Sequence, residues 1–345
     1  METADFDYEL PASAIAQAPA DERDGARLLV IDRAGRSLAD HRFSELPDLL
    51  RPGDCLVVNN SRVIPARVLA HDAVGRPVEL LFVEPVASDG RPWRALVRPG
   101  RRCRPGVELR AGDDDVRFRV TAVEPDGTRV VERIDGEVLE ALERHGLPPL
   151  PPYIAHHAKP GADDRERYQT VYALSPGSVA APTAGLHFTP AVLDHMRARG
   201  VEVHALTLHV GPATFRPITA ARVEDHVLPP ERVVIPDTVA RAVTAARAER
   251  RRIIAVGTTS IRALESAAGD DGVVRAMEGR AGIFIRPGHR FRVVDAVLTN
   301  FHLPRSSLLV LVSAFAGHDL IRSAYRHALA AHYRFYSYGD TTLIV

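Results

Sequence analysis

The sequence predicts a mixed α/β protein with a small all-β domain inserted into it. Three features support this fold class: a buried strand with polar residues at its end, a run of short β-rich segments, and a later alternation of helices and strands. The chain has 345 residues, 46% of them hydrophobic, which is enough for two domains with apolar cores. We expect residues 1–65 and 151–345 to form a large α/β domain and residues 66–150 to form an inserted β-barrel.

The first strand is expected at 54–60, an apolar run that ends in Asn59 and Asn60. Open α/β sheets bind ligands at such strand ends. From about residue 67, β-branched runs alternate with Gly, Pro and Asp turns, a pattern typical of a small barrel or sandwich. These runs lie at 77–83, 93–97, 116–123 and 128–134. The proline-rich stretch 147–153 is expected to be a stiff connector that returns the chain to the first domain.

Helices and strands alternate after this connector. Thr189 is expected to cap a helix that has Pro190 at its first position and Gly200 at its end. Strands are expected at 201–210, 251–256 and 293–298, a helix after the turn 257–260, and an amphipathic helix over 306–332.

Composition narrows the functional classes. The 44 basic and 44 acidic residues cancel, so any nucleic-acid surface must be a local patch. The longest apolar stretch, 308–316, is about half the length of a bilayer span, so no membrane segment is expected. The first ten residues include Glu2, Asp5, Asp7 and Glu9, where a secretory signal would carry positive charge, which favours the cytoplasm. Cys55 and Cys103 lack metal-ligand spacing and are expected to be buried free thiols.

The stretch 257–260, Gly-Thr-Thr-Ser, lies between a predicted strand and a predicted helix. Backbone N–H groups, hydroxyls and the positive end of a helix dipole suit a carboxylate or phosphate. A turn that only caps its helix is the commoner alternative. The sequence contains neither a Walker loop nor a Gly-x-Gly-x-x-Gly fingerprint, which disfavours a Rossmann-type methyltransferase.

His187, His209 and His302 each fall at a strand end or in a turn, where they could converge. Isolated histidines are more often structural. A zinc site would be expected to show a His-Glu-x-x-His motif or a short Cys/His pair, and the sequence has neither, so no metal is expected.

Two polar groups are candidates for ligand contacts. The first lies at the predicted domain junction and could grip a ligand or simply satisfy loop carbonyls; it comprises Asn59, Asn60, Arg62 and Arg67. The second is the densest basic cluster of the predicted barrel and could meet phosphates or form a solvated hairpin; it comprises Arg98, Arg101, Arg102 and Arg104.

Several segments, taken in order, give the chain a resemblance to a known family. They begin with Asp-Phe-Asp-Tyr-Glu-Leu-Pro at 5–11 and Ala-Pro-Thr-Ala-Gly-Leu-His-Phe-Thr at 181–189. The others are Leu-His-Val-Gly at 208–211, Val-Gly-Thr-Thr-Ser-Ile-Arg-Ala-Leu-Glu-Ser at 256–266, Leu-Thr-Asn-Phe-His-Leu-Pro at 298–304 and Tyr-Gly-Asp at 338–340. Over almost its whole length, the chain resembles the S-adenosylmethionine:tRNA ribosyltransferase-isomerase family.

The resemblance implies a tRNA-modifying transferase of queuosine biosynthesis. In that family the ribosyl unit of S-adenosylmethionine moves to 7-aminomethyl-7-deazaguanine at the wobble position of a tRNA with a GUN anticodon. The product is epoxyqueuosine, and adenine and methionine are released. S-adenosylmethionine is thus a substrate, and no cofactor or metal is implied. We expect a cytoplasmic monomer.

The chemistry needs a base beside the sulfonium, a neutral amine nucleophile and an acid for departing adenine. The acid and base candidates are His187, His209, His302, Asp225, Glu265 and Asp340. Candidates for substrate binding are Asn59, Asn60, Arg62, Arg67, Thr183, Gly185, Gly211, Gly257, Thr258, Thr259, Ser260, Arg262, Thr299 and Asn300. Arg98, Arg101 and Arg102 are the candidates for tRNA binding.

Two positions depart from the family pattern. Ala213 stands where glycine is usual, and Pro229 stands where the family has histidine, so no acid or base can act at position 229. Two rival functions remain open: a diverged member that acts on another acceptor, and a non-catalytic tRNA-binding protein. The clustering of His, Asn and carboxylate residues at strand ends disfavours the latter.

Overall fold

The structure, a computed structural model, describes residues 1–87, 90–112, 115–161, 163–215 and 217–345. Contacts divide the chain into two compact units. The α/β unit comprises Met1–Ser61, Gln169–Ser175 and Ala181–Val345, and the barrel unit comprises Arg62–Tyr168 and Pro176–Ala180. The barrel unit thus takes in more of the chain than residues 66–150.

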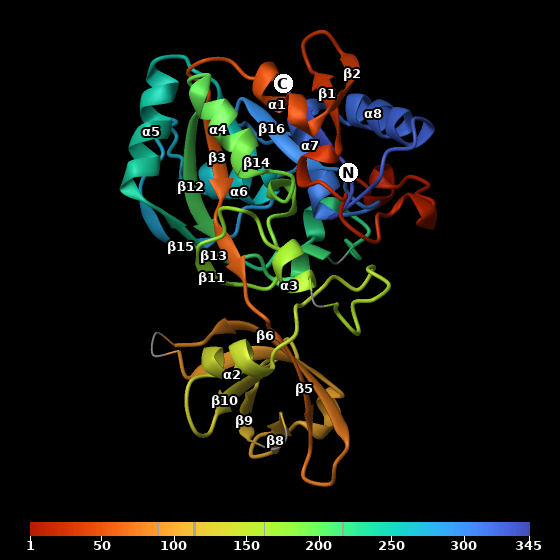
Figure 1. The fold of residues 1–345 in the computed structure, drawn as a ribbon, viewed down its shortest axis with the longest axis vertical. Coiled ribbons are helices and arrows are strands. Elements are labelled where there is room, and N and C mark those ends of the chain that lie inside the picture. The colour runs from red at the N-terminus through yellow and green to blue at the C-terminus, as the bar shows by residue number, and fades with distance from the viewer. Residues whose placement is uncertain (88–89, 113–114, 162, 216) are drawn as a thin grey trace. The chain divides into compact units, whose positions relative to one another are not determined.

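A mixed sheet forms the centre of the α/β unit (Figure 1). Across the described ranges, nine strands follow the order β15-β13-β12-β3-β14-β16-β17-β1-β2. Four neighbours run parallel: β12 (Glu202–Leu208), β3 (Cys55–Asn59), β14 (Ile253–Val256) and β16 (Ala296–Asn300). The outer strands are β1 (Arg27–Asp32), β2 (Ser37–Arg42), β13 (Glu231–Ile235), β15 (Met277–Ala281) and β17 (Thr341–Ile344). We call the shared end of the four parallel strands the carboxyl edge.

Helices pack on this sheet. Leu56 and Val58 of β3 share an apolar core with Val192, Leu193 and Met196 of α4 (Pro190–Ala198). The oxygen Oγ1 of Thr189 accepts from the N–H of Val192, 3.2 Å away, which confirms the predicted cap. The other helices of the unit are α1 (Leu46–Leu49), α5 (Asp237–Ala248), α6 (Gly257–Ala267), α7 (Ser307–Ala316) and α8 (His318–Ala330).

Two predicted elements differ from the structure. The helix expected over 306–332 is two helices, α7 and α8, because Gly317 between them has φ +89°. The strand expected to begin at Val293 begins at Ala296, because the N–H groups of Val293 and Val294 bond the Glu265 carboxylate. No single helix in the described residues is long and apolar enough to cross a membrane; α7 and α8 meet that criterion only as a pair bent by 114°.

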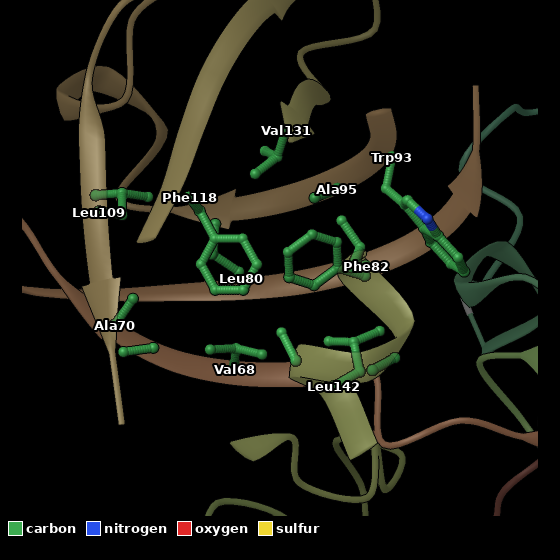
Figure 2. Packing of buried hydrophobic residues seen from close by; sticks show 14 of the residues in the cluster. Val68, Ala70, Leu80, Phe82, Trp93, Ala95, Leu109, Phe118, Val131 and Leu142 are labelled. Atoms are coloured by element: carbon green, nitrogen blue, oxygen red, sulfur yellow. The ribbon is translucent and has the colours of Figure 1, made fainter. Parts of the chain in front are cut away.

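Six antiparallel strands close the barrel of the other unit, in the order β10-β7-β6-β5-β8-β9 within the part of the chain that is described. Their apolar side chains point inward (Figure 2), with the rings of Phe82 and Phe118 5.2 Å apart and Leu142 packed beside them. The strands are β5 (Arg67–His71), β6 (Pro77–Pro85), β7 (Pro92–Arg98), β8 (Glu108–Ala111), β9 (Val116–Val123) and β10 (Arg129–Arg133). The predicted fold class, α/β with a small all-β barrel, is confirmed.

The remaining elements are short. In the barrel unit, α2 (Val138–His145) contributes Leu142 to the core, and α3 spans Asp164–Arg167. Strands β4 (Ser61–Val63) and β11 (Ser175–Ser178) pair with each other. Cys55 and Cys103 are buried and free, as predicted.

Candidate functional site

The carboxyl edge gathers residues that are far apart in the sequence. Asn59 ends β3, His209 follows β12, Gly257 follows β14 and Asn300 ends β16. Because these four strands are parallel neighbours, their ends lie side by side (Figure 1). The edge therefore brings amides, an imidazole and a helix start into one region.

His187 reaches this edge from the 3-10 turn η6 (Thr183–Gly185) and its following residues. The Thr183 hydroxyl donates to Oδ1 of Asn300, 2.9 Å away, and Nδ2 of Asn300 lies 3.3 Å from Nε2 of His187. An amide nitrogen only donates, so the neutral ring accepts at Nε2. Burial lowers the pKa of His187 to about 4, so the ring is neutral at pH 7.

His302 is held at both its side chain and its backbone. Its Nε2 lies 3.2 Å from Oγ1 of Thr299, and burial lowers its pKa to about 3. Its N–H donates to the hydroxyl of Tyr325 at 2.9 Å, and its carbonyl accepts from the hydroxyl of Tyr8 at 2.5 Å. His302 is therefore a fixed, neutral imidazole.

His209 is the most accessible of the three imidazoles, since its residue is half-buried while the other two are buried. Its backbone N–H donates to the carbonyl of Arg232 at 2.9 Å. Of the three residues His209 is therefore the least buried, although its Nδ1 atom is itself buried.

The carboxylate of Glu231 fixes the turn after β12. Glu231 was not among the residues predicted from the sequence. Its Oε1 accepts from the N–H of Gly211 at 2.9 Å and from the hydroxyl of Thr214 at 3.3 Å. Its Oε2 pairs with Nη1 of Arg262. Arg262 also donates to two carbonyls, so its guanidinium connects α6 to this turn, and its part in substrate binding stays a prediction. The family pattern Glu-Asp-His-x-Met-His-x-Glu falls at 224–231 in this chain, so Glu231 could have been found as its last residue.

The stretch 257–260 is the first turn of α6 and not a loop before it. Gly257 has φ +82°, a left-handed backbone that favours glycine. Asn59 donates to Oγ1 of Thr259 at 3.3 Å, and the Ser260 hydroxyl donates back to the carbonyl of Val256. The N-cap residue Val256 makes no side-chain capping bond to α6, and all four residues of this first turn are buried.

The three carboxylate candidates differ in their surroundings. Both oxygens of Glu265 accept from backbone N–H groups of 292–294, and those of Asp340 accept from the N–H groups of Arg27 and Arg334. Burial raises the pKa of Asp340. The carboxylates of Glu265 and Asp340 thus hold backbone segments, whereas Asp225 is exposed in η8 (Val223–Asp225).

Other candidates have structural partners or belong to the barrel unit. Asn60 accepts from the Thr207 hydroxyl at 2.7 Å. Arg67 donates to the carbonyls of His157 and Ala158 and to Glu79, so its guanidinium holds a loop of its own unit, and Arg62 is exposed on β4. Three arginines form no ion pair with any described residue: Arg98, Arg101 and Arg102.

The two departures from the family pattern lie in different settings. Ala213 lies in the 3-10 turn η7 (Pro212–Phe215) and is not among the described non-glycine residues with positive φ, so alanine adds no left-handed strain there. Pro229 is exposed, two residues before β13.

Comparisons with known proteins decide the family. The model of the family described as queuosine biosynthesis protein matches residues 3–344. The chain belongs to this family. The S-adenosylmethionine:tRNA ribosyltransferase-isomerase of Moorella thermoacetica is 48% identical over 348 residues, with 100% of both chains covered. The protein of the same name from an Anaeromyxobacter species is 51% identical over 349 residues, covering 100% of this chain and 99% of its own.

A solved structure agrees. The crystal structure of the S-adenosylmethionine tRNA ribosyltransferase of Thermotoga maritima is 34% identical, covers 99% of this chain and 100% of its own, and has a TM-score of 0.56. The resemblance found in the sequence is thus confirmed, and the match of the queuosine family over 3–344 takes in both units.

Proposed function

We propose that this protein is an S-adenosylmethionine:tRNA ribosyltransferase-isomerase that transfers the ribosyl unit of S-adenosylmethionine to 7-aminomethyl-7-deazaguanine in tRNA and yields epoxyqueuosine. The observation that carries this proposal is the full-length likeness to relatives named for this activity. We place the reaction at the carboxyl edge, because ligands of open α/β sheets bind there.

The residues of the edge suit separate tasks. His209, the least buried of the three histidines, is our candidate for the proton transfer beside the sulfonium. His187 and His302 are neutral, so they offer hydrogen bonds without adding charge beside a cationic substrate. The first turn of α6 would hold the methionine carboxylate or a tRNA phosphate.

The proposal extends to finer points. We infer that the tRNA carries a GUN anticodon, that the enzyme acts as a monomer in the cytoplasm where such tRNA is found, and that the chemistry needs no metal. Arg98, Arg101 and Arg102 would bind tRNA phosphates, because guanidinium groups without ion-pair partners can replace the counterions of the backbone.

The test is product analysis with purified protein. Adenine and methionine should appear from S-adenosylmethionine only when tRNA bearing 7-aminomethyl-7-deazaguanine is supplied, and prior chelation should leave the rate unchanged. Equal adenine release without tRNA would favour a hydrolase, and modification of a different base would favour the diverged member. Tight tRNA binding without any product would favour the binding protein.

A variant tests the role of His209. His209→Gln should lower single-turnover rates by roughly a hundredfold or more, the usual size of an acid–base contribution. His204→Gln is a matched control, because His204 lies on the same strand β12 and pairs with Glu202. Equal rates in both variants would remove His209 from the mechanism.

A further inference from the structure

Residues 5–9 belong to the N-terminal motif of the sequence, and the proposed reaction gives them no role. Together with α7 and α8 they enclose a cavity of about 250 Å³. This segment is firmly placed: the ring of Phe6 packs edge-on against His318, with centroids 5.3 Å apart, and Asp7 pairs with Arg305. The cavity is thus a built feature of the α/β unit.

Apolar side chains form most of the interior of the cavity, and one of its hydroxyls lacks a partner among the described residues. Phe6, Leu309, Ile321 and Tyr325 line it and are buried. Ser313 also lines it, is 2% exposed, and its Oγ has no hydrogen-bond partner among the described residues. A buried hydroxyl without a partner is unfavourable, and a ligand group could satisfy it. A cavity of about 150 Å³ holds benzene, so this one has room for a small organic molecule.

The mouth of the cavity carries both signs of charge. Asp5 and Glu9 are exposed on the N-terminal segment, and Arg322 and Arg326 are exposed one helical turn apart on α8. Neither arginine forms an ion pair within the described ranges. An apolar interior with a mouth of mixed charge suits a zwitterion that has an apolar body, since its carboxylate can meet the arginines and its ammonium the carboxylates.

The inner wall of the cavity touches the carboxyl edge through two tyrosines. Tyr8 and Tyr325 line the cavity with their rings 5.4 Å apart, edge to face. Their hydroxyls are the two groups that hold the peptide of His302. A ligand that moves either ring would therefore move the backbone of an edge residue.

We propose that this cavity is a regulatory site for a zwitterionic amino acid with an apolar side chain. The ligand binds with its side chain against Leu309 and Ile321 and changes the rate through Tyr8, Tyr325 and His302. The regulatory part rests on the proposed function of the carboxyl edge. The binding part does not, because it is measurable without any reaction.

Calorimetric titration of the full chain with L-methionine and L-norleucine, without S-adenosylmethionine or tRNA, tests the binding. Both should bind, whereas N-acetyl-L-methionine and L-methioninamide, which each lack one charge, should bind at least about tenfold more weakly. Equal binding of the neutralised analogues, or no binding of L-norleucine, would overturn the proposal.

Variants locate the site. Ser313→Ala and Arg326→Gln should each weaken L-norleucine binding by several-fold, and Arg241→Gln, which changes an exposed arginine of α5, should not. Because Oγ of Ser313 has no partner, Ser313→Ala should keep the melting temperature, which separates lost binding from lost folding. Unchanged affinity in both cavity variants would place the ligand elsewhere.

The turnover of adenine release tests the regulatory role. Saturating L-norleucine should change the turnover of adenine release, and Tyr8→Phe should keep the binding but abolish that change. Binding with no effect on turnover would overturn the regulatory role. A protein that binds L-norleucine but releases no adenine under any condition would instead refute the proposed function.

Discussion

Replacement of Glu231 by glutamine should destabilise the fold strongly, because it leaves the buried charge of Arg262 without its partner. Glu231 is 9% exposed and Arg262 is 3% exposed, so the pair has little water around it. Glutamine keeps an acceptor for the N–H of Gly211, and the two carbonyl contacts of Arg262 stay. What is lost is the counter-charge, and a buried charge left without its partner costs about 3–5 kcal/mol of unfolding free energy.

Urea denaturation followed by circular dichroism measures this loss, provided that the m-value stays constant. Arg241→Gln is the matched control, because Arg241 and Asp237 form an exposed i,i+4 pair on α5 that is worth about 0.3–0.5 kcal/mol. The double variant Glu231→Gln/Arg262→Met should recover much of the stability, since it removes the unpaired charge as well.

A loss of less than about 1 kcal/mol for Glu231→Gln would refute the reasoning, since that is the value of an exposed pair. An equal loss in the double variant would also refute it, because the damage would then come from packing and not from charge. Glu231 also holds the turn that follows His209. Glu231→Gln should therefore lower turnover, whether the stability loss comes from charge or from packing.

Three further predictions follow from the pKa values, the charges and the departures. Burial lowers the pKa of His187 to about 4 and of His302 to about 3, so below pH 6.5 the unfolded chain binds protons that the folded protein does not. This part of the stability is complete above pH 6.5 and is lost as the pH falls towards the folded-state pKa values of about 4 and about 3. The stability of His302→Gln should fall less steeply with pH, and parallel curves for the variant and the unaltered protein would contradict this. Neutralising the unpaired arginines of the barrel unit should reduce the slope of log tRNA affinity against log salt concentration, measured by filter retention. Neutralising ion-paired arginines of the same unit should leave that slope unchanged. The unpaired set is Arg98, Arg101 and Arg102, and the paired set is Arg117, Arg119 and Arg133. Pro229→His should alter single-turnover rates only modestly, and the appearance of an otherwise absent activity would reveal a diverged enzyme.

The sequence was sufficient to predict the strands whose ends form the carboxyl edge. Apolar runs that end in polar residues, such as the one before Asn59, predict buried strands, and parallel strands bring those ends to one edge. The cap at Thr189 was also visible, because a capping residue and a proline at the first helical position act within a few residues. Local signals of this kind need no knowledge of the tertiary fold.

Partners that are distant in the chain could not be predicted. Glu231 and Arg262 meet only because β13 lies in the same sheet as β12 and α6 packs nearby, and neither residue type reveals this. Glu265 looks like a candidate base in the sequence, yet its oxygens are taken by backbone N–H groups of 292–294. The break between α7 and α8 at Gly317 could not be predicted either, because many helices tolerate a glycine within an apolar pattern.

The strand β17 has a consequence for the order in which the sheet forms during synthesis. It lies between β16 and β1, and Asp340, just before it, binds the backbone of Arg27, 313 positions earlier in the chain. The hairpin of β1 and β2 therefore leaves the ribosome long before the neighbour that joins it to the rest of the sheet. Until residues 341–344 arrive, β1 and β16 each present an unpaired edge, and such edges invite pairing with other chains.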